Sequence, residues 1–396
     1  MITLGSAAYW RATWALSLGS LLIFFNLYVT QPLLPLLAQR FSLSPLAASW
    51  AFNITPAAMA CSLLCYGPLS DALGRRGIML VTMSGVCLCT LALSQADSYP
   101  VLLALRALQG LLLGGLPAIA IAYMNDEFEQ PALVTAVGLY IGANSLGGIG
   151  GRLIGGGLGG WLGWSDTLLV LGALSLALLA VFWRLLPPSR GFVAKPLAAK
   201  AMAAGLLGHL GRPVLLASYL IGGLNFMVFV NQYSMATFRL AEAPYGLPPS
   251  LLGLLFLTYL SGTLASTLSG PLARRWGQPG AMMAGIGLMM AGSLVTLAAP
   301  LALIVLGFLL SAFGFFLCHA NASSWVSRQA QGAKASASSL YLVFYYLGAS
   351  TGSLYLTPFW QGWGWPGVVA ASLAVCLVTL ALAARLREPA PVAVRA

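Results

Sequence analysis

The residues of this chain that could do chemistry fall into two groups, one at the ends of apolar stretches and one inside them. The stretch "GPLSDALGRRG" (67–77) places one Asp and two Arg within six positions, and "NDEFEQ" (125–130) adds three acids. Carboxylates and guanidiniums in such turns can form ion pairs. Within the apolar stretches stand Arg106, Arg152 and His319, which could bind an anion or carry a proton.

These residues do not form an enzyme site. All eight acids lie in turns or tails, so the apolar stretches hold neither a carboxylate pair nor a His/Asp cluster for acid–base chemistry. All six cysteines lie inside apolar stretches, which argues against a disulfide framework and a zinc site. No nucleotide-binding P-loop pattern is present. The sequence therefore predicts no enzyme, no metal and no cofactor.

The composition is that of a membrane protein. Of the 396 residues, 59% are hydrophobic and 7% are charged, against about 25% charged in soluble domains. Twelve apolar stretches are long enough to cross a bilayer, and they are continuous rather than alternating, which favours helices over barrel strands. The sequence predicts an all-α membrane protein of twelve transmembrane helices, near residues 12–38, 46–70, 77–95, 100–124, 133–160, 165–186, 213–238, 250–273, 279–299, 301–324, 336–360 and 365–386.

The distribution of basic residues predicts the orientation. With both termini in the cytoplasm, all Lys and Arg lie on the cytoplasmic side except Arg40 and Arg239 outside and Arg106 and Arg152 within spans. This bias also accounts for the net charge of +11, so the expected partner is the lipid bilayer and not nucleic acid.

The chain reads as two related halves. "GPLSDALGR" (67–75) is echoed by "GPLARRWGQ" (270–278), although Arg274 stands where the first copy has Asp71. We therefore predict a six-helix half over residues 1–186, a cytoplasmic linker over 187–212 and a second six-helix half over 213–396, as in transporters that alternate access around a central path.

The motifs resemble those of the major facilitator superfamily. The pattern G-x-L-[AS]-D-x-x-G-R-[RK] between spans 2 and 3 is matched by Gly67, Leu69, Ser70, Asp71, Gly74, Arg75 and Arg76, and R-x-x-Q-G in span 4 by Arg106, Gln109 and Gly110. The glycine-rich run at 138–160 is similar to the exporter motif of this superfamily, without its usual Gly-Pro pair. Phrases such as "NLYVTQPLLPLLAQRF" resemble the YnfM-type and drug–proton antiporter efflux branch.

The resemblance implies a monomeric secondary transporter of the bacterial inner membrane that moves a small organic molecule by alternating access. Export is the favoured direction, with protons as one coupling ion. An importer or exchanger of an organic anion, bound by the membrane-embedded arginines, is the alternative, and a membrane-embedded enzyme is a weaker one.

Two features are expected to control the conformational change. At the cytoplasmic ends, Asp71 should face the start of span 11 when that side is closed, while Arg75 and Arg76 should pair with acids of the turn after span 4; solvated loop charges are the alternative. The eleven glycines of 138–160 should form a smooth face packed on a helix of the other half. The predicted gating residues are Gly67, Asp71, Gly74, Arg75, Arg76, Asp126, Glu127 and Glu129.

Three interpretations remain open for how transport is coupled to an ion. Many proton-coupled relatives use a carboxylate inside a helix, and this chain has none there. Arg106 could change the protonation of a neighbour or of the substrate, His319 could carry the proton, or transport could be uncoupled or exchange anions. The alternative for His319 is a hydrogen-bonded packing role. For Arg106 and Arg152 the alternative to substrate binding is bonding to backbone carbonyls.

Polar and aromatic side chains at mid-depth predict the substrate path. Polar groups in apolar spans are costly unless they are paired or face a cavity, and aromatic walls with few polar anchors are typical of small-molecule sites. The predicted substrate-binding residues are Asn26, Tyr28, Gln31, Asn53, Arg106, Asn144, Arg152, Asn225, Phe226, Asn231, Tyr259, Tyr345 and Tyr346.

Overall fold

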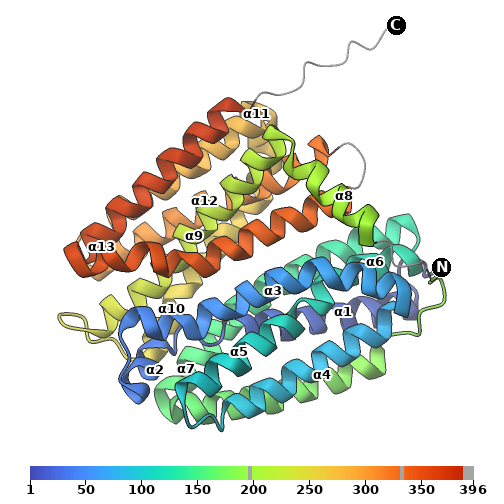
Figure 1. Ribbon diagram of the computed structural model, residues 1–396, viewed down its shortest axis with the longest axis horizontal. Coiled ribbons are helices and arrows are strands. Elements are labelled where there is room, and N and C mark those ends of the chain that lie inside the picture. Colours follow the sequence, from blue (N-terminus) through green and yellow to red (C-terminus); the bar gives the residue numbers. More distant parts are fainter. Residues whose placement is uncertain (195–198, 331–333, 387–396) are drawn as a thin grey trace, which may run out of the picture. The chain divides into compact units, whose positions relative to one another are not determined.

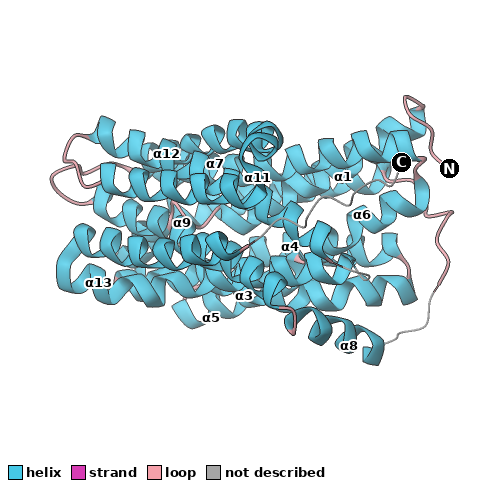
Figure 2. Ribbon diagram, turned by 90° about the horizontal axis from the view of Figure 1, so that it is seen from above, coloured by secondary structure: helices cyan, strands magenta, loops and turns pink. Residues whose placement is uncertain are grey.

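The described part of the chain is almost entirely helical (Figures 1 and 2). The computed structural model describes residues 1–194, 199–330 and 334–386; Lys195, Arg387, Arg395 and the C-terminus, which enter the predicted orientation, lie outside them. The helices are α1 (Ala7–Tyr28), α2 (Leu34–Phe41), α3 (Pro45–Leu73), α4 (Arg75–Leu93), α5 (Tyr99–Leu113), α6 (Gly115–Glu127), α7 (Gln130–Leu185), α8 (Ala199–Leu210), α9 (Pro213–Ala241), α10 (Pro249–Leu254), the 3₁₀ helix η1 (Leu255–Thr258), α11 (Tyr259–Val295), α12 (Leu301–Gln329) and α13 (Lys334–Arg385).

Three of the long helices are each a pair of helices joined at a glycine. Gly163 in α7 has φ 76°, Gly277 in α11 has φ 74° and Gly364 in α13 has φ 60°. Glycine adopts these left-handed angles without the steric cost that a Cβ brings. All three glycines lie in turns that the sequence predicts between consecutive spans, so the breaks divide each long helix where a span should end.

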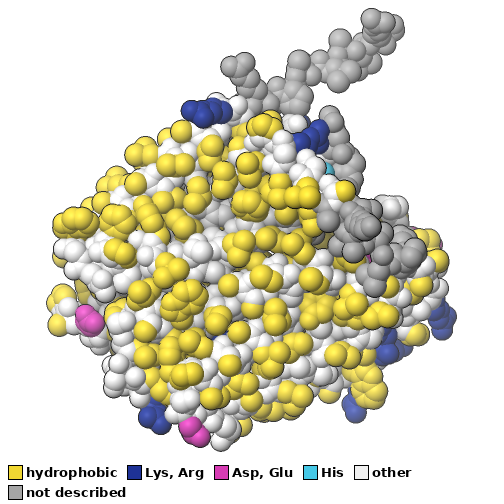
Figure 3. Space-filling view, in the orientation of Figure 1, with side chains coloured by type: hydrophobic (Ala, Val, Ile, Leu, Met, Phe, Trp, Pro, Cys, Tyr) yellow, Lys and Arg dark blue, Asp and Glu magenta, His cyan; other side chains and the backbone are white. Residues whose placement is uncertain are grey.

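The helices have the length and hydropathy of membrane spans. Eight helices or consecutive helix pairs in the described residues are long and apolar enough to cross a membrane. Three of them divide at a glycine, and α1 adds a further helix of 22 residues, which accounts for the twelve predicted spans. In Figure 3, hydrophobic side chains are spread over the visible face, and the charged side chains in view lie at its margins. The prediction of an all-α membrane protein is confirmed.

The chain divides into two compact units. Unit 1 contains Met1–Met202, Asn231–Leu257 and Ala349–Thr357, and unit 2 contains Ala203–Val230, Thr258–Gly348 and Pro358–Ala396. Unit 1 therefore joins α1–α7 to the second part of α9, to α10 and to a short part of α13. The predicted division into halves at 1–186 and 213–396, with a linker at 187–212, stays a prediction.

Glycines of α7 pack against α1 in a regular register. A Cβ added at Gly147 would lie 2.8 Å from the carbonyl oxygen of Leu21, and one at Gly151 would lie 2.5 Å from that of Phe25. Gly155 repeats the pattern with Val29 O at 2.8 Å. Every step is four residues on both helices, so the two helices run parallel with their backbones in close contact.

The glycine-rich run thus has a different main partner from the one predicted. Its glycines at four-residue spacing pack on α1, which belongs to the same half of the sequence, because α1 offers a matching row of backbone carbonyls. Gly156 does pack on the other half of the sequence, as expected, since a Cβ there would lie 2.7 Å from Pro249 O of α10. In unit 2, Gly348 of α13 meets the backbone of Gly223 of α9 in a similarly close approach.

Candidate substrate, coupling and gating sites

Arg106 of α5 is fully buried, and all five of its guanidinium N–H groups are used within the protein. Nε donates to Ala51 O at 2.9 Å, and Nη1 donates to Asn26 O at 3.1 Å and to Gln109 Oε1. Nη2 donates to Leu27 O at 3.3 Å and to Thr30 Oγ1 at 3.0 Å.

The acceptors explain why an arginine stands at this position. Helix α1 ends at Tyr28, so carbonyls of its last turn lack intrahelical partners. Arg106 reaches two of them, those of Asn26 and Leu27. This geometry favours the reading in which Arg106 holds backbone carbonyls over the readings in which it binds substrate or takes part in coupling, which stay predictions.

Asn26 belongs to the same buried network. Its Oδ1 accepts from Thr90 Oγ1 at 2.6 Å, and its Nδ2 donates to Ser175 Oγ at 2.9 Å. Thr90 in turn accepts from Gln109 Nε2 at 2.8 Å. These bonds tie α1, α4, α5 and the second part of α7 together, which is an interhelical role for Asn26. Thr90 and Ser175 were missed from the sequence, because single hydroxyls in apolar helices are common and carry little signal.

Arg152 of α7 contacts two other predicted substrate-binding residues, Tyr28 and Gln31. Its Nε donates to Gln31 Oε1 at 2.8 Å, and its Nη1 donates to Gly148 O at 2.9 Å. The guanidinium carbon lies 3.8 Å from the ring centroid of Tyr28 and 4.9 Å from that of Phe256. Arg152 is 2% exposed, so a buried cation lies over two aromatic rings, an arrangement that stabilises positive charge away from water.

Side-chain hydrogen bonds join this region to segments from the second half of the sequence. Gln31 Nε2 donates to Ser234 Oγ of α9 at 2.9 Å, and Asn53 Nδ2 of α3 donates to Ser353 Oγ of α13. The Oδ1 atom of Asn53 is buried without a hydrogen-bond partner among the described residues. Ser234, Ser353 and Phe256 were missed from the sequence because no local pattern distinguishes them.

The remaining polar residues of the predicted substrate path each bond to different partners. Asn144 of α7 accepts from Ser20 Oγ of α1. Asn231 of α9 donates to Ala349 O at 2.7 Å. Asn225, also on α9, lies in unit 2 and accepts from Thr379 Oγ1 at 2.8 Å while donating to Cys318 Sγ at 3.4 Å.

Unit 2 holds an aromatic cluster that contains several predicted residues. Phe226 stacks on Tyr345 with ring centroids 3.7 Å apart, and Tyr346 meets Tyr345 edge-on at 5.2 Å. His319 of α12 lies 4.7 Å from the Tyr345 ring, and its Nδ1 is 2.9 Å from the Tyr341 hydroxyl.

Tyr259 lies at the edge of the aromatic cluster. Its ring centroid is 5.1 Å from that of Phe229, which stacks on Phe315 at 4.1 Å, and Phe315 lies 5.5 Å from Phe226. The cluster as a whole places one titratable imidazole among aromatic rings, with Tyr341 as its hydrogen-bond partner.

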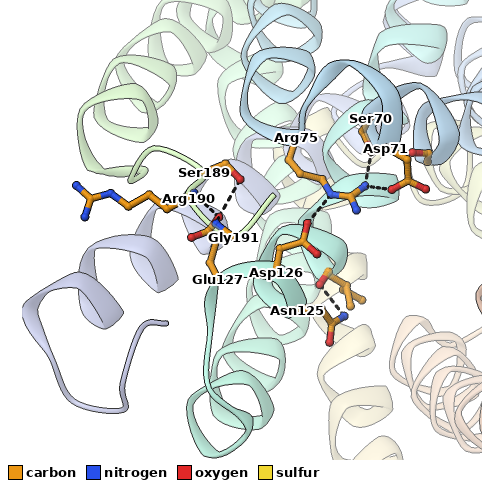
Figure 4. Close-up of polar contacts among 11 residues, drawn as sticks. Ser70, Asp71, Arg75, Asn125, Asp126, Glu127, Ser189, Arg190 and Gly191 are labelled. Atoms are coloured by element: carbon orange, nitrogen blue, oxygen red, sulfur yellow. Dashed lines mark hydrogen bonds and ion pairs between the residues drawn. The ribbon is translucent and has the colours of Figure 1, made fainter. Parts of the chain in front are cut away.

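The predicted gating residues centre on Arg75 (Figure 4). Its guanidinium pairs with Asp71 one turn earlier and with Asp126 at the end of α6, where Nε lies 2.9 Å from Oδ2. Nη1 also donates to Ser70 Oγ at 2.8 Å. Gly74 has φ 102°, the left-handed backbone that allows α3 to turn directly into α4. The structure thus places Arg75 between two acids, and the gating role of this group stays a prediction.

The other predicted gating residues make different contacts. Arg76 donates through Nη2 to Trp183 O at 3.2 Å rather than to an acid. Glu129 is exposed, and its backbone N–H donates to Ile2 O at 3.0 Å. A Cβ at Gly67 would meet nothing within 4 Å, so the surrounding packing does not require a glycine there.

Glu127 holds the first residues after α7 (Figure 4). Its Oε1 accepts from Ser189 Oγ at 2.9 Å, from the backbone N–H of Arg190 at 2.7 Å and from that of Gly191 at 2.9 Å. A Cβ at Gly191 would collide with the carbonyl oxygen of Asp126. Glu127 is 6% exposed. The sequence suggested an ion pair for this acid, whereas the structure shows a carboxylate that binds main-chain and hydroxyl donors.

Comparison with known proteins identifies the family. The sequence matches the Major Facilitator Superfamily over residues 16–353. The chain is a member of the major facilitator superfamily. It is 41% identical over 387 residues to the inner membrane transport protein YnfM of Escherichia coli (strain K12), covering 97% of this chain and 92% of that protein. It is 36% identical over 376 residues to the uncharacterized MFS-type transporter YybF of Bacillus subtilis (strain 168), covering 95% and 93%.

Solved structures agree on the fold. A bacterial homolog of the human lysosomal transporter Spinster, in an inward-facing and unoccupied conformation, superposes with a TM-score of 0.73 at 17% identity and covers 96% of each chain. This superfamily protein is therefore a multi-pass membrane transporter and not an enzyme. The superfamily resemblance stated from the motifs is confirmed.

Proposed function

We propose that this transporter exports a small organic molecule by alternating access, with protons as the coupling ion. The observation that carries the proposal is the group formed by Tyr28, Gln31 and Arg152 with Phe256. It places hydrogen-bonding groups beside aromatic faces in the interior of an apolar bundle, which is the chemistry of a small-molecule site.

Alternating access is supported by two of the contacts that join the two halves of the sequence within unit 1. Gln31–Ser234 and Asn53–Ser353 are hydrogen bonds between uncharged side chains, and a hydrogen bond of this kind contributes about 1 kcal/mol. Contacts of this strength can be exchanged for bonds to water or to substrate at little cost.

Export is supported by the glycine-rich run of α7, which is similar to the exporter motif of the superfamily, and by partial relatives. The multidrug efflux pump LfrA of Mycolicibacterium smegmatis (strain ATCC 700084 / mc(2)155) is 29% identical over 182 residues, 46% of this chain. Protons are supported as the coupling ion by His319, an imidazole within the aromatic cluster of unit 2.

A second function, uptake or exchange of an organic anion, is favoured by the Arg152 guanidinium beside the Tyr28 ring. Arginine is suited to bidentate binding of a carboxylate. A partial relative, 32% identical over 193 residues, is named as a gallate transporter of Pseudomonas putida. The two functions differ in direction and in the charge of the substrate.

Transport in oriented vesicles separates the two functions. Purified protein is first screened by thermal shift against cationic, neutral and anionic organic compounds at two pH values, and the compounds that stabilise it are tested in inside-out and right-side-out vesicles. Export predicts accumulation in inside-out vesicles that a pH gradient drives and a protonophore abolishes. Accumulation of anions alone, and only in right-side-out vesicles, would establish the second function instead.

Substitution of Arg152 tests the site itself. R152Q should remove both the binding shift and transport, because it removes the cation that lies over two rings. The matched control is R40Q, since Arg40 is an exposed arginine at the end of α2. Binding that R152Q leaves unchanged would remove this group from the substrate site.

A further inference from the structure

An apolar groove lies between α4 and the second part of α7. Its volume is about 370 Å³, and it is lined by Leu80 and Ser84 of α4 and by Leu176, Leu179, Ala180 and Trp183 of α7. Trp183 is 57% exposed and Leu176 is 39% exposed, so the groove opens to the surroundings of unit 1. In a membrane transporter, such a surface faces lipid chains. We call it the α4–α7 groove.

Three arginines gather at one end of the α4–α7 groove. Arg76 stands one helical turn before Leu80 on α4 and donates through Nη2 to Trp183 O at 3.2 Å. Arg11 of α1 donates through Nη2 to the carbonyl oxygen of the adjacent Arg184 at 3.4 Å. Arg11 and Arg184 are exposed. Both carbonyls belong to the last turn of α7, so these contacts hold the guanidinium groups of Arg11 and Arg76 at the end of that helix.

No ion pair within the described part of the chain holds the arginines of this cluster. The ion pairs formed there involve Arg75, and none involves Arg11, Arg76 or Arg184. The Nε atom of Arg76 is buried and has no hydrogen-bond partner among the described residues.

Capping of α7 explains only part of the arrangement. The C-terminal carbonyls of a helix attract cations, but each of the two contacts uses one N–H of its guanidinium at a long distance of 3.2 or 3.4 Å. The remaining Nη donors of Arg76 and Arg11 are suited to a phosphate, which accepts several hydrogen bonds from arginine at once. The apolar groove begins one helical turn away.

We propose that the α4–α7 groove binds an anionic diacyl phospholipid, with an acyl chain along Leu80, Leu179 and Trp183 and the phosphodiester against Arg76. Arg11 favours an anionic headgroup such as phosphoglycerol over a zwitterionic one, because phosphoethanolamine brings its own ammonium group to a site that already carries two guanidinium cations. The positive-inside rule predicts that this end faces the cytoplasm, where basic residues meet anionic lipid.

Native mass spectrometry of the detergent-purified full chain, with phosphatidylglycerol or phosphatidylethanolamine added at matched acyl composition, tests the proposal. We expect retained phosphatidylglycerol in excess of phosphatidylethanolamine, and about fivefold weaker retention in R76Q, as follows from about 1 kcal/mol per basic residue near the headgroup. R275Q is the matched control, because Arg275 is an exposed arginine of α11 in unit 2; it should retain phosphatidylglycerol as the wild type does.

A second variant tests the groove separately from the charges. A180W places an indole within the groove and keeps all three arginines, so it should also lower phosphatidylglycerol retention, while soluble glycerol phosphate should not compete at millimolar concentration. Equal retention of the two lipids, equal loss in R76Q and R275Q, or competition by glycerol phosphate would each overturn the proposal. Retention that A180W leaves unchanged would also overturn it, because a headgroup contact alone would then suffice.

Discussion

Replacing Arg106 tests whether this residue is a structural clamp or a binding and coupling residue. In R106Q the shorter, uncharged side chain cannot reach the five acceptors that the guanidinium now serves, namely three backbone carbonyls, one hydroxyl and one amide. A glutamine amide has two N–H donors, so at least three acceptors lose their partner. All of them lie around a side chain that is fully buried.

The expected loss follows from the number of bonds. At about 1 kcal/mol for each of three lost hydrogen bonds, the central value for the net contribution of a hydrogen bond, R106Q costs about 3 kcal/mol. At about 2 °C per kcal/mol for a unit of this size, the apparent Tm should fall by about 6 °C. R106K keeps the charge but offers three donors instead of five, so it should fall between R106Q and the wild type.

The assay is thermal unfolding of the purified protein in detergent, followed by ligand binding below the transition. R40Q provides the control, because Arg40 is exposed and its replacement should leave the Tm unchanged. If R106Q unfolds within 1 °C of the wild type and yet no longer binds or transports, the clamp is refuted. Arg106 would then act on substrate or protons directly.

Three further changes have expected outcomes. G151A should lower the apparent Tm by a few degrees, since a Cβ there meets a carbonyl of α1 at 2.5 Å and overpacking costs about 1–3 kcal/mol. G142A is the control and should be neutral, because a Cβ at Gly142 meets nothing within 4 Å. E127Q should speed tryptic cleavage after Arg190, because its side-chain amide binds the backbone donors of that segment more weakly than the carboxylate does; an unchanged cleavage rate would show that the carboxylate does not hold it. H319N should leave substrate binding intact but remove the dependence of transport on a pH gradient, and retained dependence would place the proton elsewhere.

Most of the fold could be predicted from the sequence, because the bilayer imposes a length and a hydropathy on every span. The breaks at Gly163, Gly277 and Gly364 also fall in predicted turns, since glycine stands where the backbone must become left-handed. The partner of the glycine-rich run could not be predicted. A row of small residues shows that a helix approaches closely, but it does not show which helix carries the matching row of carbonyls.

The candidate sites were predicted less completely, for a physical reason. Burial cost shows that Asn26, Arg106 and Arg152 must find partners, yet it does not distinguish a partner in the protein from a partner in a substrate. The structure finds protein acceptors for Asn26 and Arg106 and an aromatic environment for Arg152. The bonds of Glu127 to residues 189–191 run from a side chain to backbone N–H groups, and a sequence pattern records side chains only.

The packing of α1 against α7 also has a consequence for membrane insertion while the protein is being synthesised. Leu21 precedes its partner Gly147 by 126 residues, so α1 enters the membrane well before the helix that covers it has been made. At 5–20 residues per second, the interval is roughly 6–25 s. During that time α1 carries Ser20 and Asn26 without the Asn144 and Ser175 groups that they later bond. Helix α1 must therefore be sheltered by the insertion machinery, or by lipid that tolerates its polar face, until α7 arrives.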